Sequence, residues 1–466
     1  MKGSGPDVTE EEIRTIFNRQ RAFFSSGKTL DLDFRREALR KLKTALTAAE
    51  EEIISALGKD LRKPLLESYS MELGIAVQEI DFALKNLRKW ARPQKVKSPL
   101  LLFPAKSAVL AEPYGLSLII SPWNYPFQLT FCPLVSAIAA GNCCIVKPSE
   151  YAGASEQVIK TVIARAFDSS YIAVVEGDAG TGAFLLEQDF DKIFFTGSPA
   201  VGRIVMEKAA RNLASVTLEL GGKSPCIVDR EVNPELTARR ILFGKLVNTG
   251  QTCIAPDYLI VHREIKESLY AALGKGLRDF FGENPQNSPD LGRIINKRHF
   301  DRLKGYLSQG RIILGGGSDE KELYLEPTVI EVADLEAPLM REEIFGPVLP
   351  VVPYTGLEEI EGIIARNPNP LALYLFTRNK ETARTLTARI PFGGGCVNDT
   401  LFQAANQHLP FGGRGGSGSG SYHGRYGFEA FSHKKALVRN RFGFDLSLKY
   451  PPYQDRHKYL RKYLIR

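Results

Sequence analysis

Cysteine and long hydrophobic runs are both scarce in this chain. Only six cysteines occur among 466 residues, and no spacing among them matches a zinc site or a disulfide framework, so we expect reduced thiols and no bound metal. The most apolar region, residues 116–146, is interrupted by prolines and asparagines and cannot cross a bilayer as a helix. The polar N-terminus lacks a secretory pattern. We therefore expect a cytoplasmic protein.

The body of the chain also lacks a charge excess, although the formal net charge is +8. Residues 434–466 contain ten Lys or Arg and two Asp or Glu, which accounts for the whole excess. No zinc finger, RNA-binding aromatic signature or basic stripe accompanies this tail, so no nucleic-acid partner is expected. Tyr459-Leu460 and Tyr463-Leu464 recur at a spacing of four among basic residues, which predicts a short cationic amphipathic helix. Such a helix either packs on the protein body or makes weak contact with an anionic membrane surface.

Apolar residues follow first a helical and then a strand-like pattern. Leu39, Leu42 and Leu46 are spaced by three and four, and a second helical stretch covers 68–90. Further along, short apolar runs alternate with helix-like stretches. These runs cover 116–120, 143–146, 172–175, 192–195 and 216–220, and then 226–228, 258–261, 373–376 and 395–397. The alternation predicts an α/β fold with two doubly wound, mostly parallel domains.

Residues 412–420 read Gly-Gly-Arg-Gly-Gly-Ser-Gly-Ser-Gly. Glycine at this density forms neither stable helix nor stable strand, so we expect a loop. Taken alone, the composition is typical of a flexible linker.

Cys253 is the candidate nucleophile among the six cysteines. It lies in Asn248-Thr-Gly-Gln-Thr-Cys-Ile-Ala-Pro, between an expected helix and an expected strand. In such a polar loop we expect the thiol to stay accessible and its pKa to be lowered. The other five cysteines have apolar or glycine neighbours and are interpreted as core residues. An inert thiol is the alternative for Cys253 as well.

Glu219 and Asn124 are candidates for base and oxyanion chemistry. Glu219 closes an apolar strand just before Gly-Gly, where a carboxylate is poorly solvated and its pKa rises, which suits a general base. An ion pair with Lys223 is the alternative. Asn124 lies between Pro122 and Pro126, whose rigid backbone can aim its amide at an oxyanion.

The stretch Gly197-Ser-Pro-Ala-Val-Gly202 follows an expected strand and opens an expected helix. Free backbone N–H groups at a helix start can face a diphosphate. The stretch does not match the G-x-G-x-x-G fingerprint, so an ordinary strand-turn-helix connection remains the alternative.

Seven motifs, in order along nearly the whole chain, resemble the aldehyde dehydrogenase superfamily. They are Pro122-Trp-Asn-Tyr-Pro, Lys147-Pro-Ser-Glu, Phe195-Thr-Gly-Ser, Glu219-Leu-Gly-Gly-Lys, Gly250-Gln-Thr-Cys, Glu343-Ile-Phe-Gly-Pro and Leu409-Pro-Phe-Gly-Gly. The length, the Phe23-Phe-Ser-Ser-Gly-Lys-Thr opening, Tyr422-His-Gly-Arg and Tyr450-Pro-Pro-Tyr are most similar to the class 3 branch, which includes enzymes for fatty and aromatic aldehydes. In this family the glycine-rich loop is structured, although Arg414-Gly-Gly departs from the class 3 pattern.

The resemblance implies a role for each matching position. Cys253 would attack the aldehyde, Asn124 would hold the oxyanion with the Cys253 backbone N–H, and Glu219 would activate water to hydrolyse the thioester. The cofactor would be NAD, with NADP accepted less well because a carboxylate at Glu150 repels a 2′-phosphate. The implied cofactor-binding residues are Trp123, Lys147, Glu150, Gly197, Ser198, Gly202, Leu220, Glu343 and Phe345. Tyr125 and Thr252 would line the aldehyde tunnel.

The resemblance also implies a division of the chain. Residues 1–219 would form a Rossmann-like NAD(P)-binding domain, 220–398 a catalytic domain, 399–440 a bridging and oligomerisation segment, and 441–466 a basic tail. A hairpin near 101–113 and a strand near 431–438 would make up the bridging element. Related enzymes dimerise through it, so a homodimer is expected.

Three other functions compete with this interpretation. An aldehyde dehydrogenase that acylates coenzyme A would replace water by a thiol, but such enzymes usually lack the base found here as Glu219. A cofactor-independent thioester or ester hydrolase would need Cys253 and Glu219 but not Lys147, Gly197 and Glu343. A non-catalytic binding or structural protein would have no reason to keep these residues together.

Overall fold

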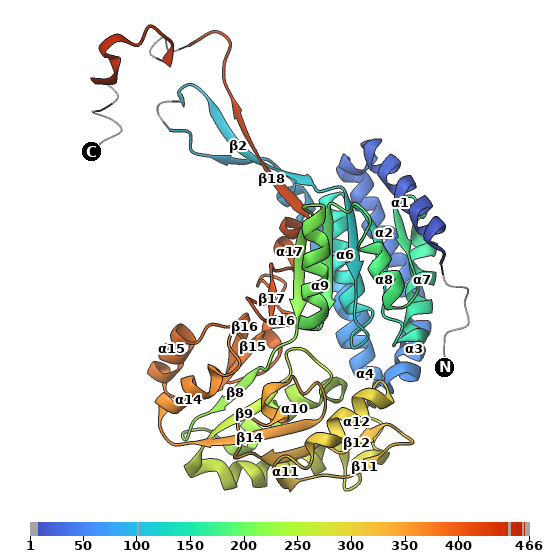
Figure 1. Ribbon diagram of the computed structural model, residues 1–466, viewed down its shortest axis with the longest axis vertical. Coiled ribbons are helices and arrows are strands. Elements are labelled where there is room, and N and C mark those ends of the chain that lie inside the picture. The colour runs from blue at the N-terminus through green and yellow to red at the C-terminus, as the bar shows by residue number, and fades with distance from the viewer. Residues whose placement is uncertain (1–7, 100–101, 446–448, 459–460, 462–466) are drawn as a thin grey trace.

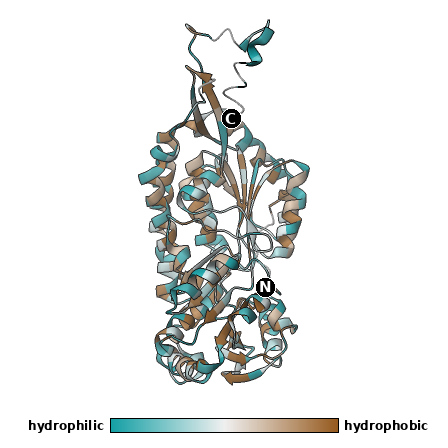
Figure 2. Cartoon of the chain, turned by 90° about the vertical axis from the view of Figure 1, so that its left-hand side faces the viewer, coloured by the Kyte–Doolittle hydropathy of each residue, from teal (hydrophilic) through white to brown (hydrophobic). Residues whose placement is uncertain are grey.

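The computed structural model describes residues 8–99, 102–445, 449–458 and 461. Figure 1 shows two α/β bodies stacked along the long axis, with a narrow arm of strands projecting from the upper one. In Figure 2 the hydrophobic colour is concentrated on strands, whereas the covering helices alternate between hydrophilic and hydrophobic faces. The predicted α/β fold with two parallel sheets is confirmed.

The first sheet has six strands in the order β17-β7-β6-β3-β4-β5. Its strands are β3 (Leu116–Ile120), β4 (Cys143–Lys147), β5 (Ile172–Val174), β6 (Lys192–Gly197), β7 (Ser215–Leu220) and β17 (Gly418–Ser419). All neighbours are parallel except β17, which is antiparallel to β7. If the five parallel strands are numbered along the chain, their spatial order across the sheet is 3-2-1-4-5, as in a dinucleotide-binding half. The order therefore reverses between β3 and β6.

Helices cover both faces of this sheet (Figure 1). They are α1 (Glu10–Ser25), α2 (Leu32–Ala48), α3 (Glu50–Leu61), α5 (Gly74–Trp90), α6 (Gln128–Ala140), α7 (Gly153–Ala166), α8 (Ala179–Leu185), α9 (Pro199–Arg211) and α17 (Gly424–Ala430). Some pack directly on the sheet and others, such as α3 and α5, pack on neighbouring helices. On α2, the periodic Leu39, Leu42 and Leu46 are fully buried, as their spacing predicts. The N-cap Ser198 accepts a hydrogen bond from the Val201 backbone N–H, and Pro199 starts α9 where a missing N–H costs nothing.

The second sheet has seven strands in the order β10-β13-β14-β9-β8-β15-β16. They are β8 (Pro225–Val228), β9 (Tyr258–His262), β10 (Arg311–Leu314), β13 (Thr328–Glu331), β14 (Val348–Tyr354), β15 (Ala372–Phe376) and β16 (Gly394–Val397). Only β10 is antiparallel to its neighbour. The helices α10 (Pro234–Leu246), α11 (Lys266–Phe281), α12 (Lys297–Tyr306), α14 (Leu357–Ile364) and α15 (Lys380–Arg389) accompany it.

The arm is a three-stranded antiparallel sheet of β1 (Gln94–Val96), β2 (Lys106–Pro113) and β18 (Ser432–Arg439). Within the described part of the hairpin predicted near 101–113 the one strand is β2, which pairs with β1 on one side and β18 on the other. The segment 399–440 contributes to several bodies, since it also supplies β17 and α17. The tail beyond β18 leaves the body in Figure 1, and Phe442 and Tyr453 are exposed.

The helix predicted for the basic tail falls at residues 459–466, which lie outside the described residues except for Arg461. Among the helices that the structure describes, none combines the length and apolar composition needed to cross a bilayer.

The glycine-rich segment 412–420 is a loop for most of its length, as expected, but it also contains a short strand that its composition did not predict. Gly418 and Ser419 form β17 and pair with Glu219 and Leu218 of β7. A Cβ at Gly418 would lie 2.4 Å from the Leu218 carbonyl oxygen, and its φ of 148° disfavours other residues. The prediction was wrong at this strand because glycine permits a backbone approach that side chains would block, and pairing with β7 then stabilises the strand.

Candidate active site

The carboxyl edge of the first sheet gathers most of the predicted site residues. Asn124 follows β3, Lys147 ends β4, and Gly197 ends β6. Glu219 is one residue from the end of β7 and pairs in register with Thr196 of β6. Ligands of open α/β sheets bind at this edge, beside the point where strand order reverses.

The loop that carries Cys253 comes from the second body. It begins at η4 (Val247–Gly250), in which Asn248, Thr249 and Gly250 have φ values of 51°, 56° and 75°. A Cβ at Gly250 would lie 2.3 Å from the Gly346 carbonyl oxygen, so only glycine fits there. This tight turn carries Gln251, Thr252 and Cys253 toward the edge of the first sheet.

Gln251 anchors this loop. Its side chain donates to the Arg293 carbonyl oxygen at 2.9 Å and accepts from the Ile295 backbone N–H at 3.0 Å. On the far side of Cys253, the Tyr374 hydroxyl donates to the Ile254 carbonyl oxygen at 2.6 Å. Bonds on both sides hold Cys253 in place.

Asn124 and Tyr125 meet this loop across the two bodies. The Asn124 side-chain N–H donates to the Gln251 carbonyl oxygen at 2.9 Å, and Asn124 is buried. The Tyr125 hydroxyl and Thr252 Oγ1 are 2.8 Å apart. The structure therefore brings the predicted residues Tyr125 and Thr252 into contact, and joins the predicted Asn124 to Gln251, over more than a hundred residues of sequence.

Glu219 is buried at 3% exposure, and neither of its carboxylate oxygens has a hydrogen-bond partner within the described part of the chain. Burial raises the pKa of Glu219 well above its usual value. The alternative ion pair with Lys223 is wrong, because the Lys223 ammonium bonds to Asp257 at 2.6 Å and to two backbone carbonyl oxygens. An unpartnered buried carboxyl beside a reactive loop is a mark of function.

The expectation of a lowered pKa for Cys253 is wrong. Burial raises the pKa of its thiol, and the nearby carboxylates of Glu343 and Glu219 raise it further. The loop is polar in sequence, but the fold places the half-buried Cys253 in the seam between the two bodies. Removing the thiol proton therefore requires a base at the time of attack.

Glu343 and Phe345 approach from the second body. The backbone of their segment is fixed because Lys223 bonds the Glu342 carbonyl oxygen at 2.9 Å and Asp257 accepts from the Ile344 N–H at 3.0 Å. Burial, with the charge of Asp257, raises the pKa of Glu343 to about 8. Its Oε1 has no partner among the residues described here.

Several of these positions are shaped as a cradle for a nucleotide. A Cβ at Gly221 would lie 1.9 Å from Glu343 Oε2, so the glycine lets this carboxylate approach the backbone. A Cβ at Gly202 would lie 2.6 Å from Leu220 Cδ2, so the glycine lets α9 pack closely on β7. The unpartnered Glu343 Oε1 and the helix start beyond Gly197 offer an acceptor for hydroxyls and donors for a diphosphate.

Other cofactor candidates lie along the same edge. The Lys147 ammonium lies 3.2 Å from the Glu150 carboxylate, with Lys147 buried and Glu150 about one-third exposed at 33%. Trp123 meets the Phe345 ring edge-on, with centroids 5.4 Å apart. The residues present fit a dinucleotide.

Sequence reasoning missed the residues that hold this site. Gln251 and Lys223 lie inside two of the motifs shared with the family, so the sequence contains a signal for both. Asp257, remote from the Glu343 motif in sequence, has no local signal, because its partners become neighbours only in the fold.

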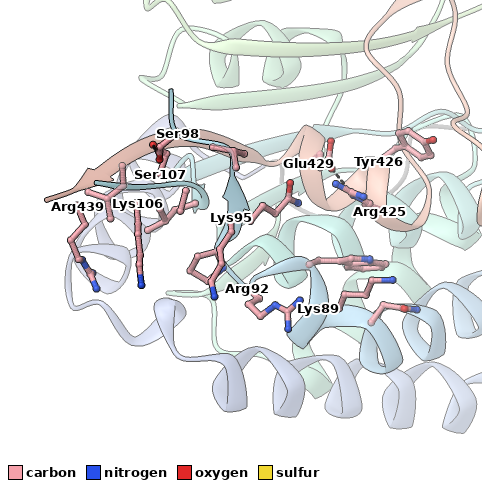
Figure 3. Close-up of a pocket in the computed structure, with 18 of the residues that line it drawn as sticks. Lys89, Arg92, Lys95, Ser98, Lys106, Ser107, Arg425, Tyr426, Glu429 and Arg439 are labelled. Atoms are coloured by element: carbon pink, nitrogen blue, oxygen red, sulfur yellow. Dashed lines mark hydrogen bonds and ion pairs between the residues drawn. The ribbon is translucent and has the colours of Figure 1, made fainter. Parts of the chain in front are cut away.

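A separate cavity of about 1530 Å³ lies between the arm and the helices α5 and α17. Figure 3 shows Arg92, Lys95, Lys106 and Arg439 around it, on the loop after α5 and the arm strands. None of the predicted catalytic, cofactor-binding or substrate-binding residues lines this cavity. No group of side chains suited to a metal ion occurs in the described part of the chain.

Comparison with known proteins identifies the relatives of this chain. The model of the aldehyde dehydrogenase family matches residues 2–437. The chain is 46% identical over 453 residues to the 4,4'-diaponeurosporen-aldehyde dehydrogenase of Staphylococcus aureus, covering 97% of this chain and 99% of the relative. It is 45% identical over 453 residues to aldehyde dehydrogenase family 3 member B1 of Rattus norvegicus, covering 97% and 96%. The substrate-bound structure of Staphylococcus aureus AldH superposes with a TM-score of 0.95 at 45% identity, covering 97% of this chain and 99% of that one.

Proposed function

Because this chain belongs to the aldehyde dehydrogenase family and is an NAD(P)-dependent oxidoreductase, we propose that Cys253, Asn124 and Glu219 carry its chemistry. The observation that supports this most is their convergence. The Asn124 amide bonds the loop of Cys253, and the unpartnered carboxyl of Glu219 lies close enough to perturb the thiol.

In the proposed mechanism, Cys253 Sγ bonds to the aldehyde carbon while its proton passes to a carboxylate or to water. The Asn124 amide has two N–H donors, and one remains beyond its bond to Gln251. That donor and the Cys253 backbone N–H stabilise the oxyanion. A bound nicotinamide would accept the hydride from the former aldehyde carbon, and the oxyanion would then re-form its C=O bond to leave a thioester on Cys253. Glu219 then takes a proton from water as the water attacks the thioester, which releases the acid and the thiol.

For the cofactor, we assign Lys147 and Glu150 to the adenosine ribose, and Gly197, Ser198 and Gly202 to the turn that faces the diphosphate. Glu343, Phe345, Trp123 and Leu220 would surround the nicotinamide half. NAD is preferred over NADP because the Glu150 carboxylate repels a 2′-phosphate, while its Lys147 partner offsets part of that repulsion.

The substrates we propose are medium- or long-chain aliphatic and aromatic aldehydes. Tyr125, Leu129 and Val247 form a small apolar cluster with Met71 and Leu401, next to Thr252. Such a wall suits an apolar chain better than a charged one. An aldehyde panel with varied chain length, read as reduced cofactor, tests this. If none of the aldehydes gave reduced cofactor, the proposed chemistry would be overturned.

The CoA-acylating alternative is less consistent with the site, because Glu219 is buried at the place where a hydrolytic base is needed. A product assay run with and without added coenzyme A distinguishes the two functions. Formation of free acid without coenzyme A supports hydrolysis.

We also propose a cytoplasmic homodimer built through the arm, with the division 1–219, 220–398, 399–440 and 441–466. Lys106 and Arg439 face each other across β2 and β18, and like charges in register repel. An anionic surface of a second copy over the arm would relieve this repulsion. Light scattering after gel filtration tests the dimer, and a monomer at micromolar concentration would overturn it.

A further inference from the structure

A fully buried ion pair lies in the segment between α3 and α5. The side chains of Lys63 and Glu72 contact each other and are both 0% exposed. Glu72 belongs to the π-helical turn η2 (Tyr69–Leu73), and the Cβ-less Gly74 accommodates the close Tyr69 carbonyl oxygen. Such turns are rare and often occur at functional sites. Burying two charges costs about as much as their attraction returns, so stability alone does not explain the pair.

The other bonds of this pair go to the backbone around Asn124. The Lys63 ammonium donates to the Asn124 carbonyl oxygen at 3.0 Å and lies 4.0 Å from the centroid of the Tyr125 ring. Glu72 Oε2 accepts from the backbone N–H groups of Phe127 at 3.1 Å and Gln128 at 3.0 Å. The pair thus holds the chain on both sides of Tyr125-Pro126.

The same segment also contacts the Cys253 loop. The Asn124 carbonyl oxygen accepts a second bond from the Asn248 side chain at 2.8 Å. Glu67, five residues before Glu72, accepts from the Asn248 backbone N–H at 2.8 Å. Asn248 is the first left-handed residue of the turn that leads to Cys253. Both loops are therefore tied to one short N-terminal segment.

We infer that Lys63 and Glu72 are positioning residues that hold the Asn124 amide against the loop of Cys253. This inference rests on the oxyanion role proposed above for Asn124. The contacts of the pair go to neither the thiol nor the nucleotide cradle but to the segment 124–128, so it acts through the backbone that carries Asn124. A displacement of about 1 Å at such a site costs about 10²-fold in rate.

The test is a double-mutant cycle between Glu72→Gln and Asn124→Ala. Glu72→Gln removes the charge of the pair and keeps the side-chain shape. Two rates are measured: the single-turnover burst of reduced cofactor, and acylation of Cys253 by an activated aryl ester without cofactor. We expect Glu72→Gln alone to slow both by about 10- to 100-fold, and by less than about twofold when Asn124 is already Ala.

Glu79→Gln is the matched control. Glu79 is a second buried carboxylate, at 3% exposure, and it accepts one backbone N–H bond, from Gly424 at 2.6 Å. It shares the burial of Glu72 but holds a different segment. We expect it to leave both acylation rates within about twofold of the native protein in each background.

Lys63→Arg provides a second variant, because it keeps the charge beside Glu72 while changing the donor geometry. It should show the same non-additivity with Asn124→Ala. Equal slowing by Glu72→Gln in both backgrounds, or unchanged rates in folded Glu72→Gln, would overturn the inference. So would failure of both variants to fold, since the pair would then serve the fold as a whole. If Asn124→Ala itself leaves both rates unchanged, the proposed oxyanion role fails as well.

Discussion

The side-chain amide of Asn124 donates to the backbone carbonyl of Gln251 at 2.9 Å, across the seam between the two α/β bodies. One residue belongs to the loop after β3 and the other to the turn before Cys253. In the oxyanion role that we propose for Asn124, this bond holds the amide against the loop of Cys253 before any substrate binds, so the proposed site needs little rearrangement. The chemistry therefore depends on how the two bodies meet.

The first prediction separates hydride transfer from hydrolysis. Cys253→Ala removes the only proposed nucleophile, so no reduced cofactor should form even in a single turnover. Glu219→Gln keeps the thiol and loses the base, so a burst of up to about one reduced cofactor per site should survive. Turnover should then fall by about 10²- to 10⁴-fold.

Mass spectrometry of the stalled Glu219→Gln protein should find the acyl group on Cys253. If Glu219 also removes the thiol proton, the burst itself slows. Full steady-state activity in Glu219→Gln, or an acyl group on another cysteine, would contradict the proposed mechanism.

The second prediction concerns Gly221→Ala. Its new Cβ would lie 1.9 Å from Glu343 Oε2, the mobile end of a side chain, so the carboxylate should move while the backbone stays. NAD affinity, measured by fluorescence titration, should fall by about tenfold or more, equivalent to about 1.4 kcal/mol. Gly153→Ala is the control, because a Cβ there meets no atom of the described chain within 4 Å. Equal affinities in the two variants would refute the cradle.

The third prediction uses the direction of the Glu343 pKa shift. Burial raises this pKa to about 8 from an ordinary value of 4.5. The native state then binds more protons than the unfolded state between these pH values, so this carboxyl destabilises the fold increasingly as pH rises from 4.5 to 8. Glu343→Gln should raise the unfolding midpoint of the cofactor-free protein at pH 9 and change it little near pH 4.5. A constant difference across the scan would contradict this.

The fourth prediction tests Glu150 as the discriminator against NADP. Glu150→Gln removes the charge that repels a 2′-phosphate and leaves Lys147 unopposed. The ratio of kcat/KM for NADP to that for NAD should rise by about tenfold, or about 1.4 kcal/mol. Glu187→Gln, which alters an ion pair with Lys208 on the surface, serves as the control. Native protein that prefers NADP tenfold would already refute the assignment.

The fifth prediction concerns the basic tail. Phe442 and Tyr453 are exposed, at 112% and 60%, whereas the ring of the tail residue Phe444 meets that of Phe103 edge-on. If the tail contacts membranes, the protein should co-sediment with anionic vesicles at low salt and lose this on deletion of residues 454–466. Neutral vesicles are the control. Binding that persists after the deletion would remove the tail from consideration.

The sequence alone determined the fold class and the family, and it suggested which residues carry the proposed chemistry. Short apolar runs mark their strands locally, because a buried parallel strand needs few residues and little context. Thus β3 matches the predicted 116–120, whereas β14, with Pro350 and Pro353, was not predicted although it is central and buried. Proline disfavours a strand locally, and only its neighbours in the sheet show that it is tolerated here.

Tertiary structure alone decided the electrostatics of the site and the residues that support it. A polar loop suggested a lowered pKa for Cys253. The interface between the two bodies instead buries the thiol near two carboxylates, which raises its pKa. Lys223 lies four residues from Glu219, yet Asp257 takes it as a partner and leaves Glu219 unpaired. Lys63 and Glu72 contact the Asn124 segment from far away in sequence. Burial and long-range pairing set these properties, and neither is encoded in a local stretch of residues.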